Sequence, residues 1–334
     1  MTATQVIDEI KKGNVKPVYF LYGDEPYFID LISGYIQEHL LDESEKGFDQ
    51  TILYGRDTSV EDIIAAARRY PMMASRQVII VKEAQELARH IGKLEAYVKD
   101  PQPSTVLVIN YKYKTPGKHR KLVDAIKKTG ILFRSDPVRD YQIPGWIKTY
   151  VKDQGYSIDD KSAILLSEYI GSDLSRIVNE LNKLKLVLKE GEAITPGLIE
   201  KHIGISKDYN NFELQNALVN KNAAKAFRIV RYFASNPKSY SVVFIVYSLF
   251  NYYSLLLKYH GLPVKSSPQK IAAALKISPY YAKALGVAAA KISMRETARN
   301  ISILREYDLK SKGVDSRNLS ARDLLTEMVF RLIH

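Results

Sequence analysis

The turn after the first expected strand is the first place where this sequence could carry chemistry. The apolar run at 17–22 ends at Gly23, and a glycine turn between a strand and a helix is where backbone N–H groups bind phosphate. An active loop of the pattern G-x-x-x-x-G-K-S/T also needs a second glycine, a lysine and a hydroxyl. Those positions hold Phe28, Ile29 and Asp30. We therefore predict a degenerate loop with no bound cofactor and no catalytic residue.

Other catalytic and metal patterns are missing as well. The strand expected at 78–81 is followed by Lys82-Glu83, so an acidic metal ligand directly after it is not expected. The 6 histidines have no metal-ligand spacing and there is no G-x-S-x-G motif. The absence of cysteine excludes a thiol nucleophile and a disulfide framework, and it fits a reducing cytoplasm. An ATPase with an unconventional nucleotide site stays open as an alternative.

Met72 and Met73 form a second candidate site, for binding rather than catalysis. By residue type alone, two methionines fit an ordinary core more readily than a surface. One local argument favours exposure: adjacent helical residues point about 100° apart, so both rarely enter one core. In addition, Pro71 breaks the preceding helix just before them.

The net charge of +12 is unevenly distributed. Residues 1–140 carry 21 basic and 20 acidic side chains, residues 141–210 carry 9 and 10, and residues 211–334 carry 19 and 7. The whole excess therefore lies in the last third. It indicates either a surface that faces DNA or acidic neighbours, or solvated helix faces, and the sequence does not decide between them.

Short apolar runs that alternate with helical spacing up to residue 140 predict a parallel sheet covered on both faces. In this part a helix capped by Ser59 is expected to run to about Tyr70. From residue 141 the helical period takes over, and a polar break at 205–211 separates a small helical region from a longer one. The predicted fold is α/β followed by all-α, with domains at 1–140, 141–210 and 211–334.

The longer helical region contains a stretch that could be mistaken for a membrane span, at 242–257. It is shorter than the ~20 residues that a bilayer requires, and its polar residues line one side of a helix. We expect a largely buried packing helix and no membrane association. Single helices are expected over 212–233 and 284–304, and the polar first residues do not resemble a signal peptide.

Four segments together resemble one family over essentially the full chain: VYFLYGDEPYFID, RRYPMMASRQVIIV, GSDLSRIVNELNKL and NFELQNAL. The sequence resembles the delta subunit of the bacterial DNA polymerase III clamp loader. The resemblance implies an AAA+ type α/β domain with a degenerate nucleotide loop, a small helical lid domain and a C-terminal helical collar domain. The loop at Gly23 agrees with this independently.

The resemblance also implies a cytoplasmic function in DNA replication. Such a subunit binds and opens the sliding clamp, so that the clamp can be loaded on primed DNA. It works in a pentamer with ATP-hydrolysing subunits and a second non-hydrolysing subunit. The clamp contact falls on Met72 and Met73, where the family often has leucine and phenylalanine types; a thioether chain is likewise apolar and suits irregular pockets.

Whether the chain counts as an enzyme stays open. No catalytic site of its own is expected, although the DNA-directed DNA polymerase activity of the holoenzyme can be assigned to its subunits. No paired-aspartate, two-metal arrangement is visible in the sequence. Two other functions remain as alternatives: a free-standing basic DNA-binding protein, and an AAA+ ATPase with an unconventional nucleotide site.

Overall fold

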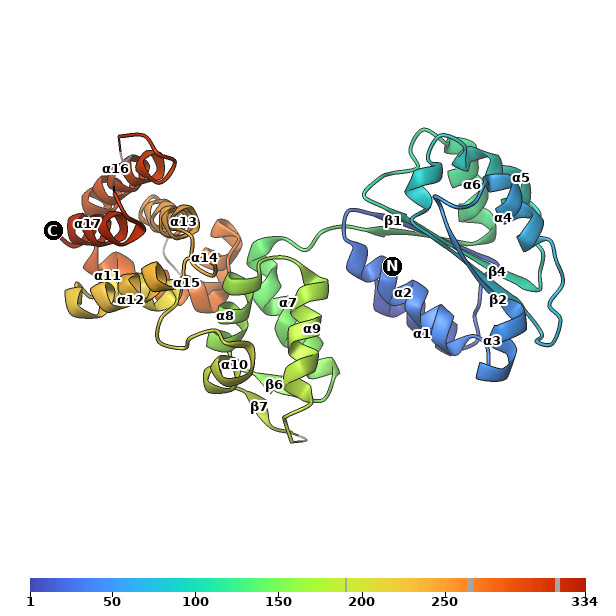
Figure 1. Ribbon diagram of the computed structural model, residues 1–334, viewed down its shortest axis with the longest axis horizontal. Coiled ribbons are helices and arrows are strands. Elements are labelled where there is room, and N and C mark those ends of the chain that lie inside the picture. The colour runs from blue at the N-terminus through green and yellow to red at the C-terminus, as the bar shows by residue number, and fades with distance from the viewer. Residues whose placement is uncertain (190, 263–266, 316–318) are drawn as a thin grey trace. The chain divides into compact units, whose positions relative to one another are not determined.

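The computed structural model describes residues 1–189, 191–262, 267–315 and 319–334. The chain forms two compact units, Met1–Val138 and Arg139–His334 (Figure 1). The first unit ends close to the boundary predicted at 140. The second contains both predicted helical regions, and their division at 210 stays a prediction.

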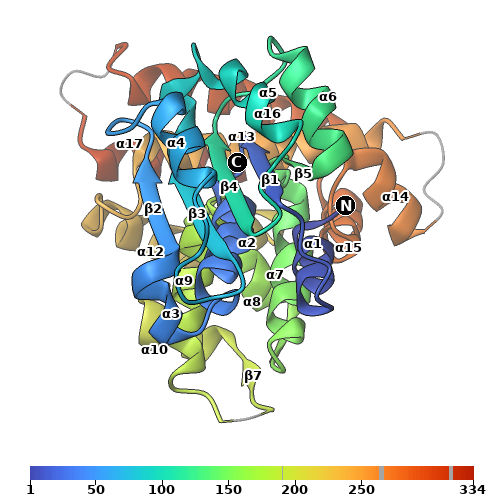
Figure 2. The same ribbon diagram turned by 90° about the vertical axis from the view of Figure 1, so that its right-hand side faces the viewer.

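The first unit is built on a parallel sheet with strand order β2-β3-β4-β1-β5 (Figure 2). The strands are β1 (Val18–Gly23), β2 (Gln50–Tyr54), β3 (Gln77–Lys82), β4 (Thr105–Lys112) and β5 (Ile131–Ser135). In β1, Val18 and Phe20 enter one apolar cluster, whereas Tyr19 and Leu21 enter the other. This alternation is the period of a strand buried on both faces, which is why the central strands read as continuous apolar runs.

Helices cover both faces of this sheet (Figure 2). They are α1 (Ala3–Lys11), α2 (Pro26–His39), α3 (Glu43–Asp49), α4 (Val60–Ala67), α5 (Glu95–Val98) and α6 (Arg120–Thr129), with 3₁₀ turns η1 (Ala84–Leu87) and η2 (Ile91–Leu94). Apolar residues of α1 and α2 pack on one face, and those of α4, α5 and α6 pack on the other. The predicted α/β class is confirmed.

Several expectations for this unit need correction. Helix α4 ends at Ala67 rather than near Tyr70, because the chain leaves the helix after the cap at Arg68. Strand β3 continues one residue further than expected, to Lys82. Elements α1, α3 and β2 were not predicted: α3 is mostly charged and β2 is a partly exposed edge strand, so neither presents a long apolar run.

The second unit is mainly helical. Its helices are α7 (Ile143–Asp153), α8 (Asp160–Ile170), α9 (Leu174–Lys185), α10 (Pro196–Ile203), α11 (Asn211–Val219), α12 (Ala223–Ser235), α13 (Val242–His260), α14 (Pro268–Leu275), α15 (Pro279–Lys291), α16 (Met294–Ser311) and α17 (Ala321–Ile333); the short elements are η3 (Asp140–Gln142), β6 (Ser157–Ile158) and β7 (Ala193–Ile194). The β6–β7 pair is parallel and was not expected from the sequence. The all-α class predicted for this part is otherwise confirmed.

The two long helices expected at 212–233 and 284–304 are each divided in two. The first breaks at Asn220 to Asn222, where Lys221 adopts a left-handed φ of 54° and Asn222 caps α12. The second breaks at Ile292 and Ser293, and the Ser293 side chain caps α16. In both places the apolar period continues across the break, so the capping residues were the only sequence signal.

Helix α13 is more exposed than the sequence suggested. Its residues Ile245, Leu249 and Tyr253 are buried in the apolar cluster of the second unit, but Tyr247 and Phe250 face solvent. Within the described ranges, α13 is the single helix that has the length and apolar composition to span a membrane. Its buried face packs inside the helical unit, as expected for a core helix.

Two carboxylates join α8 to the helices that follow it in the second unit. Glu213 in α11 pairs with Lys161 of α8 and Lys225 of α12, at N–O distances of 2.7 and 2.5 Å. Glu168 in α8 accepts a hydrogen bond from the backbone N–H of Phe212. Its Oε2 is shielded from solvent and has no hydrogen-bond partner among the described residues. The charge of Glu213 is therefore compensated, whereas that of Glu168 is not.

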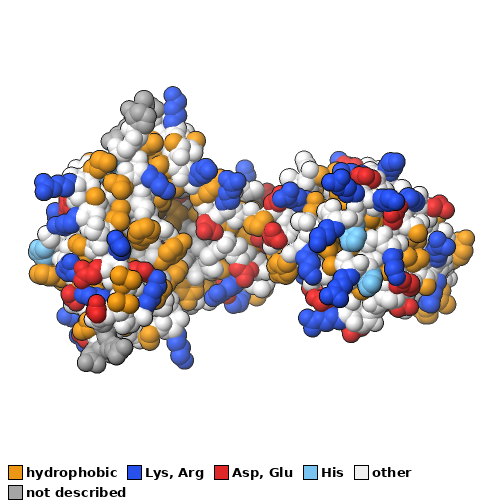
Figure 3. Space-filling view, turned by 90° about the horizontal axis from the view of Figure 1, so that it is seen from above, with side chains coloured by type: hydrophobic (Ala, Val, Ile, Leu, Met, Phe, Trp, Pro, Cys, Tyr) orange, Lys and Arg blue, Asp and Glu red, His pale blue; other side chains and the backbone are white. Residues whose placement is uncertain are grey.

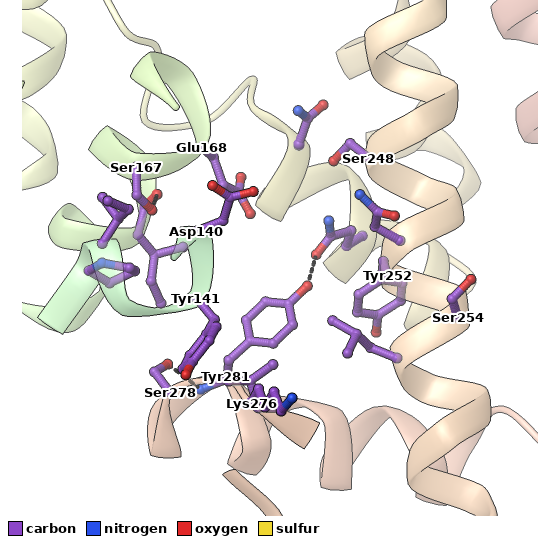
Figure 4. Close-up of a pocket in the computed structure, with 18 of the residues that line it drawn as sticks. Asp140, Tyr141, Ser167, Glu168, Ser248, Tyr252, Ser254, Lys276, Ser278 and Tyr281 are labelled. Carbon is purple, nitrogen blue, oxygen red and sulfur yellow. Dashed lines mark hydrogen bonds between the residues drawn. The ribbon is translucent and has the colours of Figure 1, made fainter. Parts of the chain in front are cut away.

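Glu168 also lines a cavity of about 510 Å³ within the second unit (Figure 4). Tyr281 projects into the same cavity from α15, and its hydroxyl donates to Oε1 of Gln215 at 3.2 Å. Burial raises the pKa of Glu168 to about 7, although the Phe212 N–H acts in the opposite direction. Removal of a carboxylate from water disfavours its charged form.

We predict that Glu168 makes the protein less stable as the pH rises from about 4.5 to 7. In this window the folded protein keeps a proton that the unfolded chain has lost, since the pKa rises from 4.5 to about 7 on folding. Glu168→Gln, which cannot ionise, should remove roughly 1–3 kcal/mol of this pH dependence. Denaturant unfolding at several pH values measures it, with the exposed Asp153→Asn as a control for the loss of one charge. Parallel pH profiles for wild type and Glu168→Gln would contradict the prediction.

Candidate functional site

The turn after β1 is filled by protein atoms. Gly23 has a φ of 133°, and a Cβ at this position would lie 2.1 Å from the backbone oxygen of Ser135 in β5. Ser135 accepts a hydrogen bond from the backbone N–H of Glu25 and donates its hydroxyl to the Glu25 oxygen at 2.6 Å. Strand pairing places Gly23 directly opposite Ser135. Glycine is thus required here by the close approach of β1 and β5, and a phosphate site is not needed to explain it.

The start of α2 is occupied by a carboxylate of the chain itself. Glu25 caps the helix, and its Oε1 accepts the backbone N–H of Tyr27 at 3.0 Å. Pro26, the first helical residue, has no N–H to offer. Glu25 is buried, so its negative charge lies where an incoming phosphate would have to bind. Sequence reasoning missed Glu25, although its position before Pro26 was a readable capping signal.

The residues that stand where a phosphate-binding pattern needs a glycine, a lysine and a hydroxyl have other roles; they are Phe28, Ile29 and Asp30. Ile29 is fully buried in the apolar cluster between the sheet and helices α1 and α2, and Phe28 packs against that cluster. Asp30 pairs with Lys112 at the end of β4, at 2.9 Å, and Lys112 also lies 3.4 Å from Glu83. Burial lowers the pKa of Lys112, but its contacts with Asp30 and Glu83 outweigh this effect and hold the pKa above its usual value.

Strand β3 ends at Lys82 and not at residue 81, so Glu83 follows it directly; this corrects the expected strand end, while the missing metal ligand stays a prediction. Glu83 has a left-handed φ of 52°. Its carboxylate faces Lys112 and accepts a hydrogen bond from Gln85. Among the described residues, no group of three or more His, Cys, Asp or Glu side chains is arranged to hold a metal ion. An ion-pair cluster of Asp30, Glu83 and Lys112 therefore links α2, β3 and β4 at the carboxyl ends of these two strands.

We predict that Gly23→Ala destabilises the protein by about 2–4 kcal/mol, because the added Cβ would overlap the Ser135 backbone in an unfavourable conformation. Gly34→Ala is the matched control. Gly34 lies inside α2, and apart from the adjacent backbone of that helix nothing lies within 4 Å of the added Cβ, so alanine should be neutral or stabilise by up to about 1 kcal/mol. Denaturant unfolding measures both variants. Equal stabilities would mean that the end of β1 can move away from β5 at little cost.

The methionine pair lies on the surface, in an irregular segment between α4 and β3. Met72 is 77% exposed and Met73 is 60% exposed. The neighbouring Tyr70 and, at the end of α3, Phe48 are also exposed. The core alternative for the two methionines is therefore wrong. Large apolar side chains gathered at the surface indicate an interaction site.

The segment that bears the methionines is fixed at its start by polar side chains. The buried Gln77 donates from Nε2 to the backbone oxygens of Ala66 and Arg69 and, at 2.8 Å, to Oγ1 of Thr105. The Thr105 hydroxyl donates to the Ala67 oxygen at 2.9 Å. These side chains donate to backbone oxygens at and just beyond the end of α4, where the helix itself supplies few donors. The helix end is thereby tied to β3 and β4.

A second anchor, which the sequence did not reveal, is Asp49. Its carboxylate accepts the backbone N–H groups of Met72, Met73 and Ala74, with N–O distances of 2.5, 2.8 and 2.7 Å. Burial alone would raise the pKa of Asp49, but the three N–H groups together hold it below its usual value. Asp49 is 23 to 25 residues away in the sequence, so no local motif could have indicated this contact.

Strand pairing explains how Asp49 reaches this segment. Asp49 immediately precedes β2, and the methionine segment leads into β3. These two strands are parallel neighbours, with Gln50 opposite Val78. Parallel neighbours are entered from the same edge of a sheet, so the residues just before them lie close together.

The basic side chains of the last third are partly used in ion pairs. Lys221 pairs with Glu296, and Lys310 and Arg331 both pair with Glu306. On the face shown in Figure 3, the Lys and Arg side chains of the helical unit are separated by hydrophobic and other side chains and form no continuous patch. This arrangement favours solvated helix faces over one extended polyanion surface on that face.

Comparison with known proteins supports one family. The family model described as DNA polymerase III, delta subunit, matches residues 19–135. The model described as DNA polymerase III delta subunit, C-terminal domain, matches residues 208–328. The two models match in order and together cover more than two thirds of the chain. The chain belongs to the DNA polymerase III delta subunit family.

Individual relatives agree with this assignment. The DNA polymerase III subunit delta of Bacillus subtilis (strain 168) is 25% identical over 323 residues, which span 93% of this chain and 92% of the relative. The solved structure of the Bacillus subtilis DNA clamp loader delta protein (YqeN) is 24% identical, with a TM-score of 0.56 over 99% of each chain. The structural match shows a shared fold.

Proposed function

We propose that this protein is a clamp loader subunit that binds and opens the sliding clamp, without hydrolysing ATP itself. The observation that carries the proposal is the exposed pair Met72 and Met73, held on a fixed backbone in a member of the delta subunit family. The activity is one of binding. The conformational state of the partner subunits would decide whether the pair is available to the clamp.

The size of the apolar pair is sufficient for a specific contact. Burial of two methionine side chains contributes roughly 3–6 kcal/mol before the costs of association. The flexible thioether chain adapts to the shape of an apolar pocket. Tyr70 and Phe48 are exposed on neighbouring segments and could enlarge the buried area.

The absence of ATP hydrolysis is supported by the turn after β1. Lys112 is engaged by Asp30 and Glu83, and the start of α2 is capped by Glu25. ATP would have to displace a buried carboxylate and find a magnesium ligand elsewhere. We infer that the ATP cycle belongs to partner subunits.

Assembly with such partners is supported by the outer face of α13. Val243, Tyr247 and Phe250 follow one another at helical spacing and are exposed, which is unusual for a monomer surface. We propose that the last third packs with ATP-hydrolysing subunits and a second non-hydrolysing subunit in a pentamer. In this proposal the complex works in the cytoplasm and meets primed DNA as a whole.

We predict that Met72→Ala with Met73→Ala weakens clamp binding by about 100-fold or more and leaves the fold intact, because both side chains are exposed in the free protein. Titration against the cognate sliding clamp measures the affinity, and thermal unfolding checks the fold. Met294→Ala removes an exposed methionine from the second unit and should bind as the wild type does. Unchanged affinity of the double variant would remove the site assignment.

We also predict that ATP with magnesium neither raises the melting temperature of the isolated chain nor is hydrolysed by it. A ligand that bound the folded state at 100 times its Kd would stabilise it by about 2.7 kcal/mol, which thermal unfolding detects readily. A clear shift would instead favour the alternative of an ATPase with an unconventional nucleotide site. A non-hydrolysable ATP analogue in the same assay separates binding from turnover.

A further inference from the structure

Asp49 occupies a position where a carboxylate is costly. It is the last residue of α3 and is 3% exposed. The end of a helix carries partial negative charge, which repels a carboxylate, and burial removes the water that would solvate it. Among the described residues, no Lys, Arg or His forms an ion pair with Asp49, and no cation contributes to its pKa. An apolar or amide side chain would avoid these costs, so the acid needs a specific reason.

The three N–H groups of Met72, Met73 and Ala74 provide that reason. They belong to consecutive residues of a segment without regular structure, and their donors converge on the two oxygens of one carboxylate. Successive backbone N–H groups form a concave site for an anion. Hydrogen bonds to a charged acceptor contribute more than neutral ones. The carboxylate thus fixes three peptide units together.

The fixed backbone determines where the side chains point. Ala74 packs against the apolar cluster between the sheet and helices α1 and α2. The backbone N–H groups of Met72, Met73 and Ala74 point toward Asp49. The side chains of Met72 and Met73 are left facing solvent. Exposed apolar side chains on an unfixed loop would tend to fold back on nearby apolar surface. The bonds to Asp49 oppose that rearrangement.

We propose that Asp49 is a positioning residue for the clamp contact, which presents Met72 and Met73 before the clamp arrives. This inference rests on the proposed function, in which the two methionines make that contact. A loop that is already ordered loses less entropy on binding. If only a fraction of the molecules presents the pair, the apparent association constant equals the intrinsic constant multiplied by that fraction.

The test compares two substitutions of Asp49 in the full chain, with the cognate sliding clamp as the binding partner. Asp49→Ala removes both acceptor oxygens, and with them all three hydrogen bonds, and should weaken clamp binding by about 10-fold or more. Asp49→Asn keeps one oxygen, which can still accept the bonds from Met73 and Ala74, so its effect should be smaller. The exposed Asp57→Asn controls for the loss of one negative charge and should bind as the wild type does.

Two further measurements separate positioning from a general loss of structure. Amide hydrogen exchange at residues 72–74 should speed up in Asp49→Ala, whereas Met72→Ala with Met73→Ala should leave these amides protected. In Asp49→Ala the association rate should fall while the dissociation rate stays near that of the wild type, because the bound methionines make the same contacts. If Asp49→Ala does not fold, Asp49→Asn decides by the same measurements.

The outcomes distinguish this inference from the function on which it rests. If the methionine double variant loses binding but both Asp49 variants bind as the wild type does, the clamp contact stands and the positioning role is overturned. The same holds if Asp49→Ala leaves the amides of 72–74 protected. If the methionine double variant binds normally, the proposed contact itself fails, and the inference fails with it.

Discussion

The parallel direction of the five strands in the first unit is the constraint on which both candidate sites depend. Because every strand runs the same way, all segments that leave strands gather at one edge of the sheet, and all segments that enter strands gather at the other. Gly23 is the last residue of β1 and Glu83 follows β3, whereas Asp49 precedes β2 and the methionine pair precedes β3. The turn after Gly23 and the methionine segment therefore lie at opposite edges, and each is completed by a neighbouring strand.

The same constraint explains why a glycine stands at Gly23 although the other positions of a phosphate-binding pattern hold Phe28, Ile29 and Asp30. Its pairing with β5 brings the Ser135 backbone too close for any side chain. The glycine serves the strand contact itself, and Glu25 with Pro26 closes the start of α2. A glycine at this place is consequently weak support for a phosphate site, because strand geometry alone can require it.

The sequence predicted those features that leave a local periodic signal. The apolar central strands are of this kind, because burial on both faces produces a continuous apolar run. The start of α4 is another example, because the Ser59 hydroxyl caps it. The edge strand β2 and the breaks at Asn222 and Ser293 were missed, because their signals are single residues or half-exposed runs. The exposure of the methionines followed only weakly from Pro71, and their anchor at Asp49 depends on a strand pairing that no local pattern contains.

In the proposed clamp contact, methionine makes a fixed backbone more important than a stiffer side chain would. A thioether chain has three rotatable bonds and adapts to its pocket, so the direction in which it leaves the surface must come from the main chain. Asp49 supplies that direction, and its lowered pKa keeps the carboxylate ionised throughout the physiological pH range. Titration of Asp49 near neutral pH therefore does not release the segment. In the proposed function, control over the methionine pair would come from partner subunits that cover or uncover the segment.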